Sequence, residues 1–141
     1  MSRPENRSQL MKYFGAKQKN VHWSWCAINE KEKSVYFSVW TDFRNKFGDK
    51  GRNYYTIQGP DWGIDKETGS SSPARNDQDE KLDKVLNQDY EAFCYFIEAK
   101  DKNAHPREIE STRTTFVFSL ELERLDDGTV IGYPLERIDV R

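Results

Sequence analysis

The stretch WSWCAINEKEKSVYFSVWTD, residues 23–42, decides the fold because its side chains change character at every second position. This alternation runs through residues 23–28 and again through residues 35–40, and a charged segment, residues 29–34, separates the two runs. A period of two is typical of β-strands whose faces meet different surroundings. Two such runs joined by a short polar segment predict a β-hairpin with aromatic residues on both of its faces.

Further strand patterns lie outward from this hairpin. Three runs rich in aromatic and apolar residues predict strands over residues 54–58, 90–99 and 114–125. The pair Asp127-Gly128 predicts a tight turn, after which residues 129–131 and 134–140 return as short strands. The predicted fold class is α+β: a small curved β-barrel or half-barrel of about six strands, with one main helix and short flanking helices.

The main helix is predicted from Leu82, Val85 and Leu86, which stand at helical spacing. Three acidic residues are expected at its N-terminus, where negative charge is favourable: Asp77, Asp79 and Glu80. Residues 59–76 are rich in Gly, Ser, Pro and Asp and are expected to form a long surface loop, while Pro106 to Glu110 is expected to add one helical turn. Residues 1–20 are expected to form an N-terminal arm or short helix, followed by a single domain over residues 21–141.

Composition limits the size and the surroundings of this domain. The 141 residues are 35% hydrophobic and 13% aromatic, with 4 Trp, so the core must depend on rings rather than on aliphatic bulk. No run approaches the ~20 apolar residues of a membrane span, and we expect a cytoplasmic protein without membrane contact. Cys26 and Cys94 lie in apolar runs and are expected to be reduced core residues.

Charge is unevenly distributed along the chain. Residues 1–60 hold 11 Lys and Arg against 5 Asp and Glu, a balance of +6, whereas residues 61–141 hold 11 against 19, a balance of −8. Four basic residues cluster in the segment 43–53 and are predicted to bind phosphate: Arg44, Lys46, Lys50 and Arg52. The alternative is that the asymmetry averages out once the chain folds.

No catalytic constellation is evident, so no catalytic residue, metal or cofactor is assigned. His22 and His105 are the only histidines, which excludes metal sites built from several of them, and neither has a supporting motif. An enzyme would have to use Asp42, Glu98 or His22, and this remains the third interpretation of the sequence. Asp42 directly follows the strand that ends near Trp40, where a carboxylate either caps a turn or accepts a hydrogen bond from a polar ligand.

Three tryptophans on neighbouring predicted strands are the strongest functional signal: Trp23, Trp25 and Trp40. Indole rings offer large apolar faces with one N–H donor, which suits stacking on a flat ligand with polar edges, such as a nucleobase. The alternative is that these rings fill the core, and at least one of the three is expected to be structural.

The runs HWSWCAINEKEKSVYFSVWTD, residues 22–42, and EAKDKNAHPREI, residues 98–109, resemble a PUA-like domain of the superfamily that includes the EVE, YTH and SRA modules. Such domains occur alone or N-terminal to HNH endonucleases in bacteria. The resemblance implies a curved barrel with an aromatic pocket for a modified base, which the DNA-reading members flip out of the duplex. This sequence contains no HNH motif, so no cleavage activity is carried over.

Carried onto this chain, the resemblance marks five candidate pocket residues: Trp23, Ser24, Trp25, Trp40 and Asp42. In the second segment it marks Lys100, Asp101, Arg107 and Glu108. Lys100 and Arg107 are candidates for phosphate contact, or else Asp101 and Glu108 are their partners within the fold.

The first functional hypothesis is therefore a nucleic-acid-binding domain that recognises a modified base, for which methylated cytosine in DNA is one candidate. RNA stays open as the nucleic acid, and a separate nuclease is a candidate partner. The alternative is a small-molecule or protein-interaction domain that uses the same pocket without nucleic acid.

Overall fold

A computed structural model describes residues 3–20, 24–45, 52–104 and 107–140. In these residues the α-helices are α1 (Arg7–Tyr13) and α2 (Pro73–Asn87), and a 3-10 turn, η1, spans Thr41–Phe43. The strands are β1 (Cys26–Asn29), β2 (Ser34–Trp40), β3 (Arg44–Asn45), β4 (Tyr54–Gln58), β5 (Glu91–Ala99), β6 (Ile109–Thr112), β7 (Phe116–Arg124) and β8 (Val130–Asp139).

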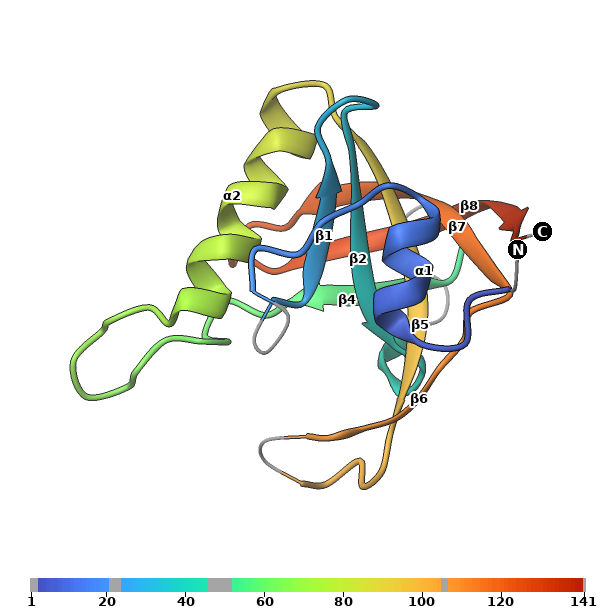
Figure 1. The fold of residues 1–141 in the computed structure, drawn as a ribbon. Coiled ribbons are helices and arrows are strands. Elements are labelled where there is room, and N and C mark those ends of the chain that lie inside the picture. Colours follow the sequence, from blue (N-terminus) through green and yellow to red (C-terminus); the bar gives the residue numbers. More distant parts are fainter. Residues whose placement is uncertain (1–2, 21–23, 46–51, 105–106, 141) are drawn as a thin grey trace.

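All of these strands join one mixed sheet in the order β1-β2-β5-β7-β8-β4-β3, with β6 paired to β5. The β2–β5 pair is parallel and the other pairs are antiparallel. In Figure 1, β7, β8 and β4 run across β1, β2 and β5 rather than alongside them, so the sheet is strongly curved. The predicted α+β class is confirmed, and the PUA-like assignment stays a prediction.

The sheet holds eight strands instead of about six. Two of the additional strands are short: β3 has two residues and β6 has four, too few to show a pattern in the sequence. The helical turn expected up to Glu110 is wrong, because β6 begins at Ile109 and pairs with β5. Short edge pairings of this kind depend on which strand lies alongside, and local sequence does not encode that.

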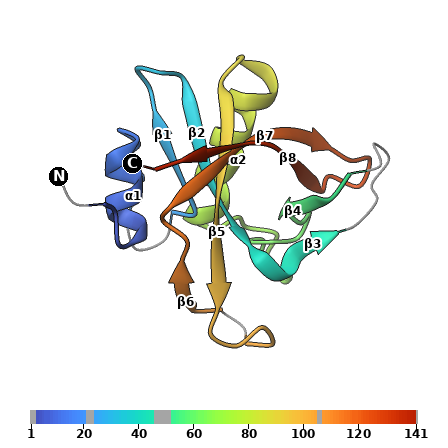
Figure 2. The same cartoon turned by 90° about the vertical axis from the view of Figure 1, so that its right-hand side faces the viewer.

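The predicted hairpin is confirmed by the antiparallel pairing of β1 and β2, with Cys26 opposite Phe37. Strand β1 begins at Cys26, so Ser24 and Trp25 precede it. The alternation of the hairpin corresponds to two separate core clusters. Val35, Phe37 and Val39 pack with Leu82 of α2, whereas Tyr36 packs with α1 in the second cluster. The two helices flank the hairpin on opposite sides, as Figures 1 and 2 show, so both of its faces are buried.

Helix α1 is the short helix expected within residues 1–20. Leu10 and Met11 are 0% and 2% exposed and belong to the second core cluster. Asn6 caps the helix by accepting a hydrogen bond from the Gln9 N–H. The segment thus contributes to the same core as the hairpin.

Helix α2 begins four residues before Asp77, which corrects the predicted position of its acidic residues. Ser72 is the N-cap and Pro73 opens the helix, so no acidic residue lies in the first turn. Asp77 is instead buried against β1, where it pairs with Lys81 at 2.6 Å and accepts a hydrogen bond from the Cys26 thiol. Burial and the Asp77 charge raise the pKa of Cys26 well above its ordinary value. The predicted surface loop ends earlier for the same reason.

The segments 129–131 and 134–140, predicted as separate strands, form the single strand β8. Gly132 permits this, since a Cβ there would lie 2.7 Å from the Leu120 side chain. Pro134 pairs where the β7–β8 register shifts, and the Ser119 hydroxyl accepts the Glu136 N–H at 3.0 Å. A side chain therefore replaces the backbone acceptor at the irregularity.

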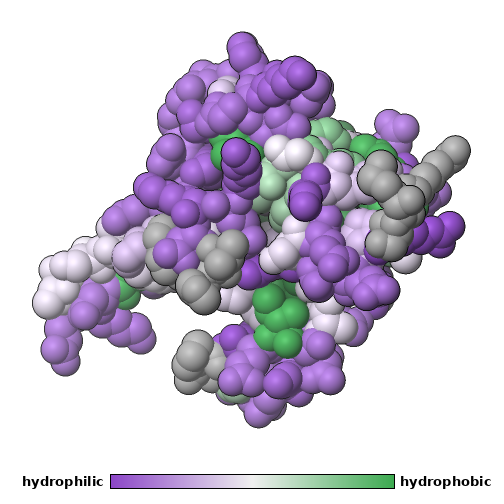
Figure 3. Space-filling model, in the orientation of Figure 1, coloured by the Kyte–Doolittle hydropathy of each residue, from purple (hydrophilic) through white to green (hydrophobic). Residues whose placement is uncertain are grey.

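Both cysteines are free and buried, as expected. None of the helices in the described ranges has the length and apolar character needed to cross a membrane. Figure 3 shows one face of the molecule as mostly hydrophilic, with apolar side chains exposed only in small separate areas.

Candidate functional site

A cavity of about 560 Å³, here called the aromatic pocket, opens between β2, β4 and the N-terminal half of α2. Its aromatic wall consists of Trp25, Trp40, Phe43 and Trp62. Its principal polar side chains are Ser38, Gln58, Gln78 and Arg107. These residues come from six separate segments of the chain, so the pocket exists only in the folded sheet.

Trp25 and Trp40 are brought together by the β1–β2 pairing. The Ser38 N–H and hydroxyl both donate to the Trp25 carbonyl, at 3.1 and 2.7 Å, and fix the chain at the start of β1. The two indole rings then lie 5.7 Å apart at an interplanar angle of 49°. At this distance the tilted rings contact each other, so they form adjoining parts of one aromatic wall on which a planar ligand can stack.

Arg107 is clamped beside this aromatic wall. Its guanidinium makes two hydrogen bonds of 2.8 Å to the two carboxylate oxygens of Asp42, and a third of 2.8 Å to the Lys102 carbonyl. It lies 5.1 Å from the Trp40 ring centroid and 4.6 Å from that of Phe43. The pocket therefore carries a fixed positive charge stacked on its own aromatic wall.

The clamp gives Asp42 and Arg107 roles that differ from the predicted ligand and phosphate contacts. Hydrogen bonds from Arg107 hold the pKa of Asp42 below its ordinary value, and the same bonds raise the pKa of Arg107. Both groups stay charged at neutral pH, and both Asp42 oxygens are engaged by the arginine. Asp42 is thus a positioning residue for Arg107.

Two buried amides form the polar part of the wall. Gln78 donates from Nε2 to Gln58 Oε1 at 3.0 Å, and Gln58 donates from its own Nε2 to Asp79 at 2.8 Å. The two glutamines are 5% and 2% exposed, so burial and this chain of bonds fix their orientation.

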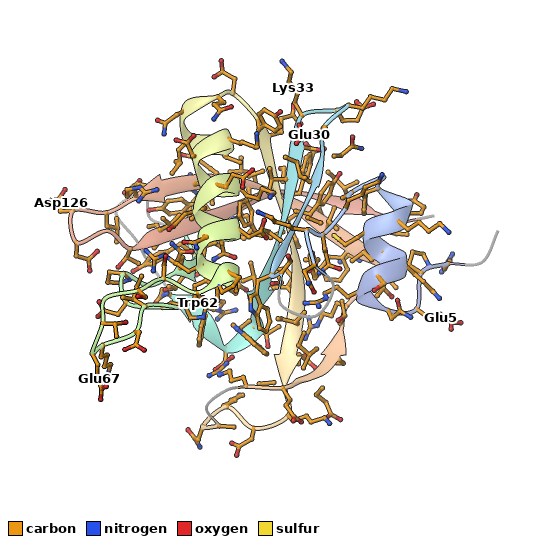
Figure 4. All side chains as sticks on the ribbon, turned by 60° about the vertical axis from the view of Figure 1, so that its left-hand side comes forward. Glu5, Glu30, Lys33, Trp62, Glu67 and Asp126 are labelled. Carbon is orange, nitrogen blue, oxygen red and sulfur yellow. The ribbon has the colours of Figure 1, made fainter. Side chains whose placement is uncertain are left out.

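Trp62 lies on the loop that precedes α2, close to the N-terminal end of the helix, whereas Glu67 marks the loop's tip in Figure 4. Arg75 holds this part of the loop by donating to the carbonyls of Gly59, Pro60 and Trp62. Gly63 has a φ of +71°, and a Cβ there would lie 2.7 Å from the Arg75 side chain. Close approach to the helix and the left-handed conformation both require glycine.

Ser24, a predicted pocket residue, does not line the cavity. It is 1% exposed, and its hydroxyl accepts a hydrogen bond from the Asn20 N–H at 3.0 Å. Its role is to close a turn before β1. The predicted pocket residue Trp23 and the predicted phosphate contacts Lys46 and Lys50 lie outside the described residues.

The predicted phosphate contacts separate into three places. Lys100 forms an ion pair with Glu108 at 3.5 Å, which fits the alternative that these residues are partners within the fold. Arg107 belongs to the aromatic pocket. Arg44 and Arg52 line a different cavity, of about 660 Å³, together with Arg113 and Arg137. We call this second cavity the arginine trough.

Sequence reasoning missed half of the aromatic wall and most of the polar one. Phe43 could have been found, because it follows Asp42 directly and extends the run of aromatic residues. Trp62 lies in a segment with loop composition, where a lone tryptophan is itself a signal. Nothing in the sequence marks Gln58 and Gln78 as buried, since Gln58 ends a short strand and Gln78 is one of many polar residues in α2.

The carboxylates considered for catalysis are engaged in ion pairs. Hydrogen bonds from Arg113 and Ser111 lower the pKa of Glu98, as Arg107 does for Asp42. A general base needs a pKa near the working pH, and these shifts go in the opposite direction. Across the described residues no three His, Cys, Asp or Glu side chains come together as metal ligands would. His22 lies outside this part of the chain.

Comparison of the chain with protein-family models, with curated proteins and with solved structures gives no match. Any functional assignment therefore depends on the geometry of the two cavities.

Proposed function

We propose that the protein binds nucleic acid and recognises a modified base in the aromatic pocket. The observation that carries the proposal is one cavity that combines tilted indole faces, two oriented amides and a fixed cation. A volume of about 560 Å³ is within the range of small-ligand sites, ~300–1,000 Å³, and accommodates a base with part of its sugar.

Stacking supplies the first part of the recognition. Trp25 and Trp40 present tilted rings 5.7 Å apart, and Trp62 adds an indole that is 38% exposed at the rim. Base stacking on an aromatic side chain is worth about 1–3 kcal/mol per base. A base that stacks on this wall must leave its own stack, which favours single-stranded or flipped nucleotides.

The amides supply the second part, because stacking alone does not distinguish one base from another. Gln78 and Gln58 are held by the bond chain that ends on Asp79, so their polar atoms have fixed positions. A base edge with complementary donors and acceptors is bound, and an edge that leaves them unpaired is rejected at a cost of about 1–3 kcal/mol.

The fixed charge of Arg107 favours a base over a methylated ammonium group, the other common ligand of an aromatic cage. Cages that bind methylated ammonium groups use the ring faces to attract a cation. Here the guanidinium already lies over Trp40 and Phe43, so a second cation would be repelled. A neutral base, or one with electron-rich edge atoms, is compatible with that charge.

A methyl group is the modification that suits these walls best, because it adds apolar area that an indole can cover. One methyl group discriminates by about 1–3 kcal/mol, a factor of roughly 10–200. Methylated cytosine in DNA is accordingly the first modification to examine.

The test is fluorescence-anisotropy binding to short oligonucleotides that contain one modified or unmodified cytosine or adenine. Single and double strands of DNA and RNA are compared. We expect one modification to be preferred by at least about tenfold, and Trp40→Ala to abolish that preference. Trp40→Phe is the matched control, because it keeps an aromatic face and should retain part of the preference.

Binding without any preference for a modified base would contradict the proposal. Absence of binding to every oligonucleotide would favour a small-molecule or protein ligand in the same pocket. Circular dichroism of each variant shows whether a lost preference reflects a lost fold.

A further inference from the structure

Four arginines from four different parts of the sheet converge on the arginine trough. Arg44 lies in β3, Arg52 just before β4, Arg113 just after β6 and Arg137 in β8. The remaining lining residues are neutral, and four of them are rings that form the floor: Tyr55, Phe96, Phe116 and Phe118. Among the described residues, four positive charges and no acidic side chain line this cavity, which suits an anionic ligand.

The rings orient two of these guanidinium groups. Arg137 lies 4.2 Å from the Phe116 ring centroid, and Arg52 lies 4.9 Å from that of Tyr133. Stacking fixes the plane of a guanidinium while leaving its N–H groups free to point along that plane. Planar, oriented donors match the paired oxygens of a phosphate.

Three of the arginines have carboxylate partners, but these ion pairs are exposed. Arg52–Glu121, Arg113–Glu98 and Arg137–Asp139 have side chains between 38% and 59% exposed. Exposed pairs contribute only about 0–1 kcal/mol, so a phosphate can displace the carboxylate at little cost. The three carboxylates, Glu121, Glu98 and Asp139, are not among the residues that line the trough.

From this arrangement we infer that the arginine trough is a second binding site, which holds consecutive phosphates of a nucleic acid strand. The inference deepens the proposed function and rests on it for the identity of the anion. Two short segments, residues 40–44 and β4, contribute to both cavities. In the first segment, Trp40 and Phe43 line the pocket, and Thr41 and Arg44 line the trough. A strand whose base enters the pocket passes its backbone across this shared wall.

The test uses the dependence of binding on salt concentration. Each phosphate contact on a single strand contributes about 0.7 to the slope of log K against log salt. The double variant Arg44→Gln/Arg137→Gln should therefore reduce the slope by about 1.4 and weaken binding at low salt. Its preference for the modified base should stay unchanged. Lys31→Gln/Arg124→Gln is the matched control, because it removes two exposed charges that do not line the trough.

Two readouts keep this inference separate from the proposed function. The salt slope of the arginine variant could be unchanged while Trp40→Ala abolishes the modification preference. That result would overturn phosphate binding in the trough and support base recognition in the pocket. A reduced slope without any modification preference supports the trough and contradicts the proposed function.

The source of the phosphate is tested by competition. Oligonucleotides without terminal phosphates should bind, and inorganic triphosphate should compete only weakly with them. Tight binding of triphosphate, together with no binding of such oligonucleotides, would identify a free polyphosphate ligand and overturn the assignment to a nucleic acid strand.

Discussion

The aromatic pocket and the arginine trough share one wall, yet they hold their arginines in opposite ways. Arg107 and its partner Asp42 are 15% and 17% exposed, and the guanidinium makes bonds to both carboxylate oxygens. Arg113 and Glu98 in the trough region are 49% and 42% exposed. Arg107 is thus held by a partly shielded pair at the wall of the pocket, whereas Arg113 is held by an exposed pair.

Exposure sets this difference because water screens a charge pair at the surface and does not reach a buried one. A shielded pair resists exchange and keeps the site in one geometry. An exposed pair exchanges its partner readily. We therefore expect the contribution of an ion pair to fall as its exposure rises, and the Asp77–Lys81 pair beside the pocket is the most buried case.

The largest effect is expected for Asp77→Ala, which removes the partner of Lys81 next to Gln78. The Lys81 and Asp77 side chains are 6% and 1% exposed, so the variant leaves an unpaired buried ammonium. We expect the free energy of unfolding to fall by about 3–5 kcal/mol in urea denaturation. The double variant Asp77→Leu/Lys81→Met should recover most of this loss, because it removes both charges. A loss below about 1 kcal/mol in the single variant would contradict the claim that buried ion pairs are held more firmly than exposed ones.

The second effect concerns the clamp itself. A double-mutant cycle with Asp42→Ala and Arg107→Ala should give a coupling free energy of about 2 kcal/mol, because the pair makes two charge-assisted hydrogen bonds that are partly shielded from solvent. Both single variants should also weaken binding of the modified base. A coupling below about 0.5 kcal/mol would place this pair with those of the trough and contradict the comparison.

A third variant, Trp62→Ala, separates binding from stability within the pocket. Trp62 is 38% exposed, so its loss should change the free energy of unfolding by less than about 0.5 kcal/mol. Affinity for the modified oligonucleotide should fall about tenfold, through the loss of one stacking face. Tyr13→Ala is the control: this ring is 46% exposed on α1 and does not line the pocket. If both variants bind the modified oligonucleotide with equal affinity, Trp62 does not contribute to the binding site.

The smallest effect is expected in the trough. A double-mutant cycle on Arg113 and Glu98 should give a coupling of about 0.2–1 kcal/mol, and it should shrink as salt is added. A coupling as large as that of Asp42 and Arg107 would mean that the trough arginines are held too firmly to accept phosphate.

Sequence patterns predicted the parts of this fold that repeat locally. The alternation in residues 23–42 predicted a hairpin with aromatic residues on both faces, and the spacing of Leu82, Val85 and Leu86 predicted α2. The start of α2 was misplaced because Ser72 and Pro73 look like loop residues until a helix follows them. The joining of β8 across Pro134 depends on Ser119 of a neighbouring strand, which no local pattern reveals.

The candidate site was predictable only where one segment carries it. Trp25 and Trp40 come from the hairpin and were recognised, but Gln58, Trp62 and Gln78 reach the pocket from β4, a loop and α2. The pairing of Asp42 with Arg107 joins residues 65 positions apart, so each was assigned to a ligand instead of to the other. Long-range pairing of this kind follows from the sheet order.

The central claim, that the aromatic pocket holds the modified base, is tested most directly by NMR of the indole N–H groups. Signals of ¹⁵N-labelled protein are assigned with single Trp→Phe variants and followed while the preferred modified oligonucleotide is added. The account predicts that the signals of Trp25, Trp40 and Trp62 shift with the modified oligonucleotide and shift much less with its unmodified counterpart. Binding that leaves these three signals unmoved would contradict it.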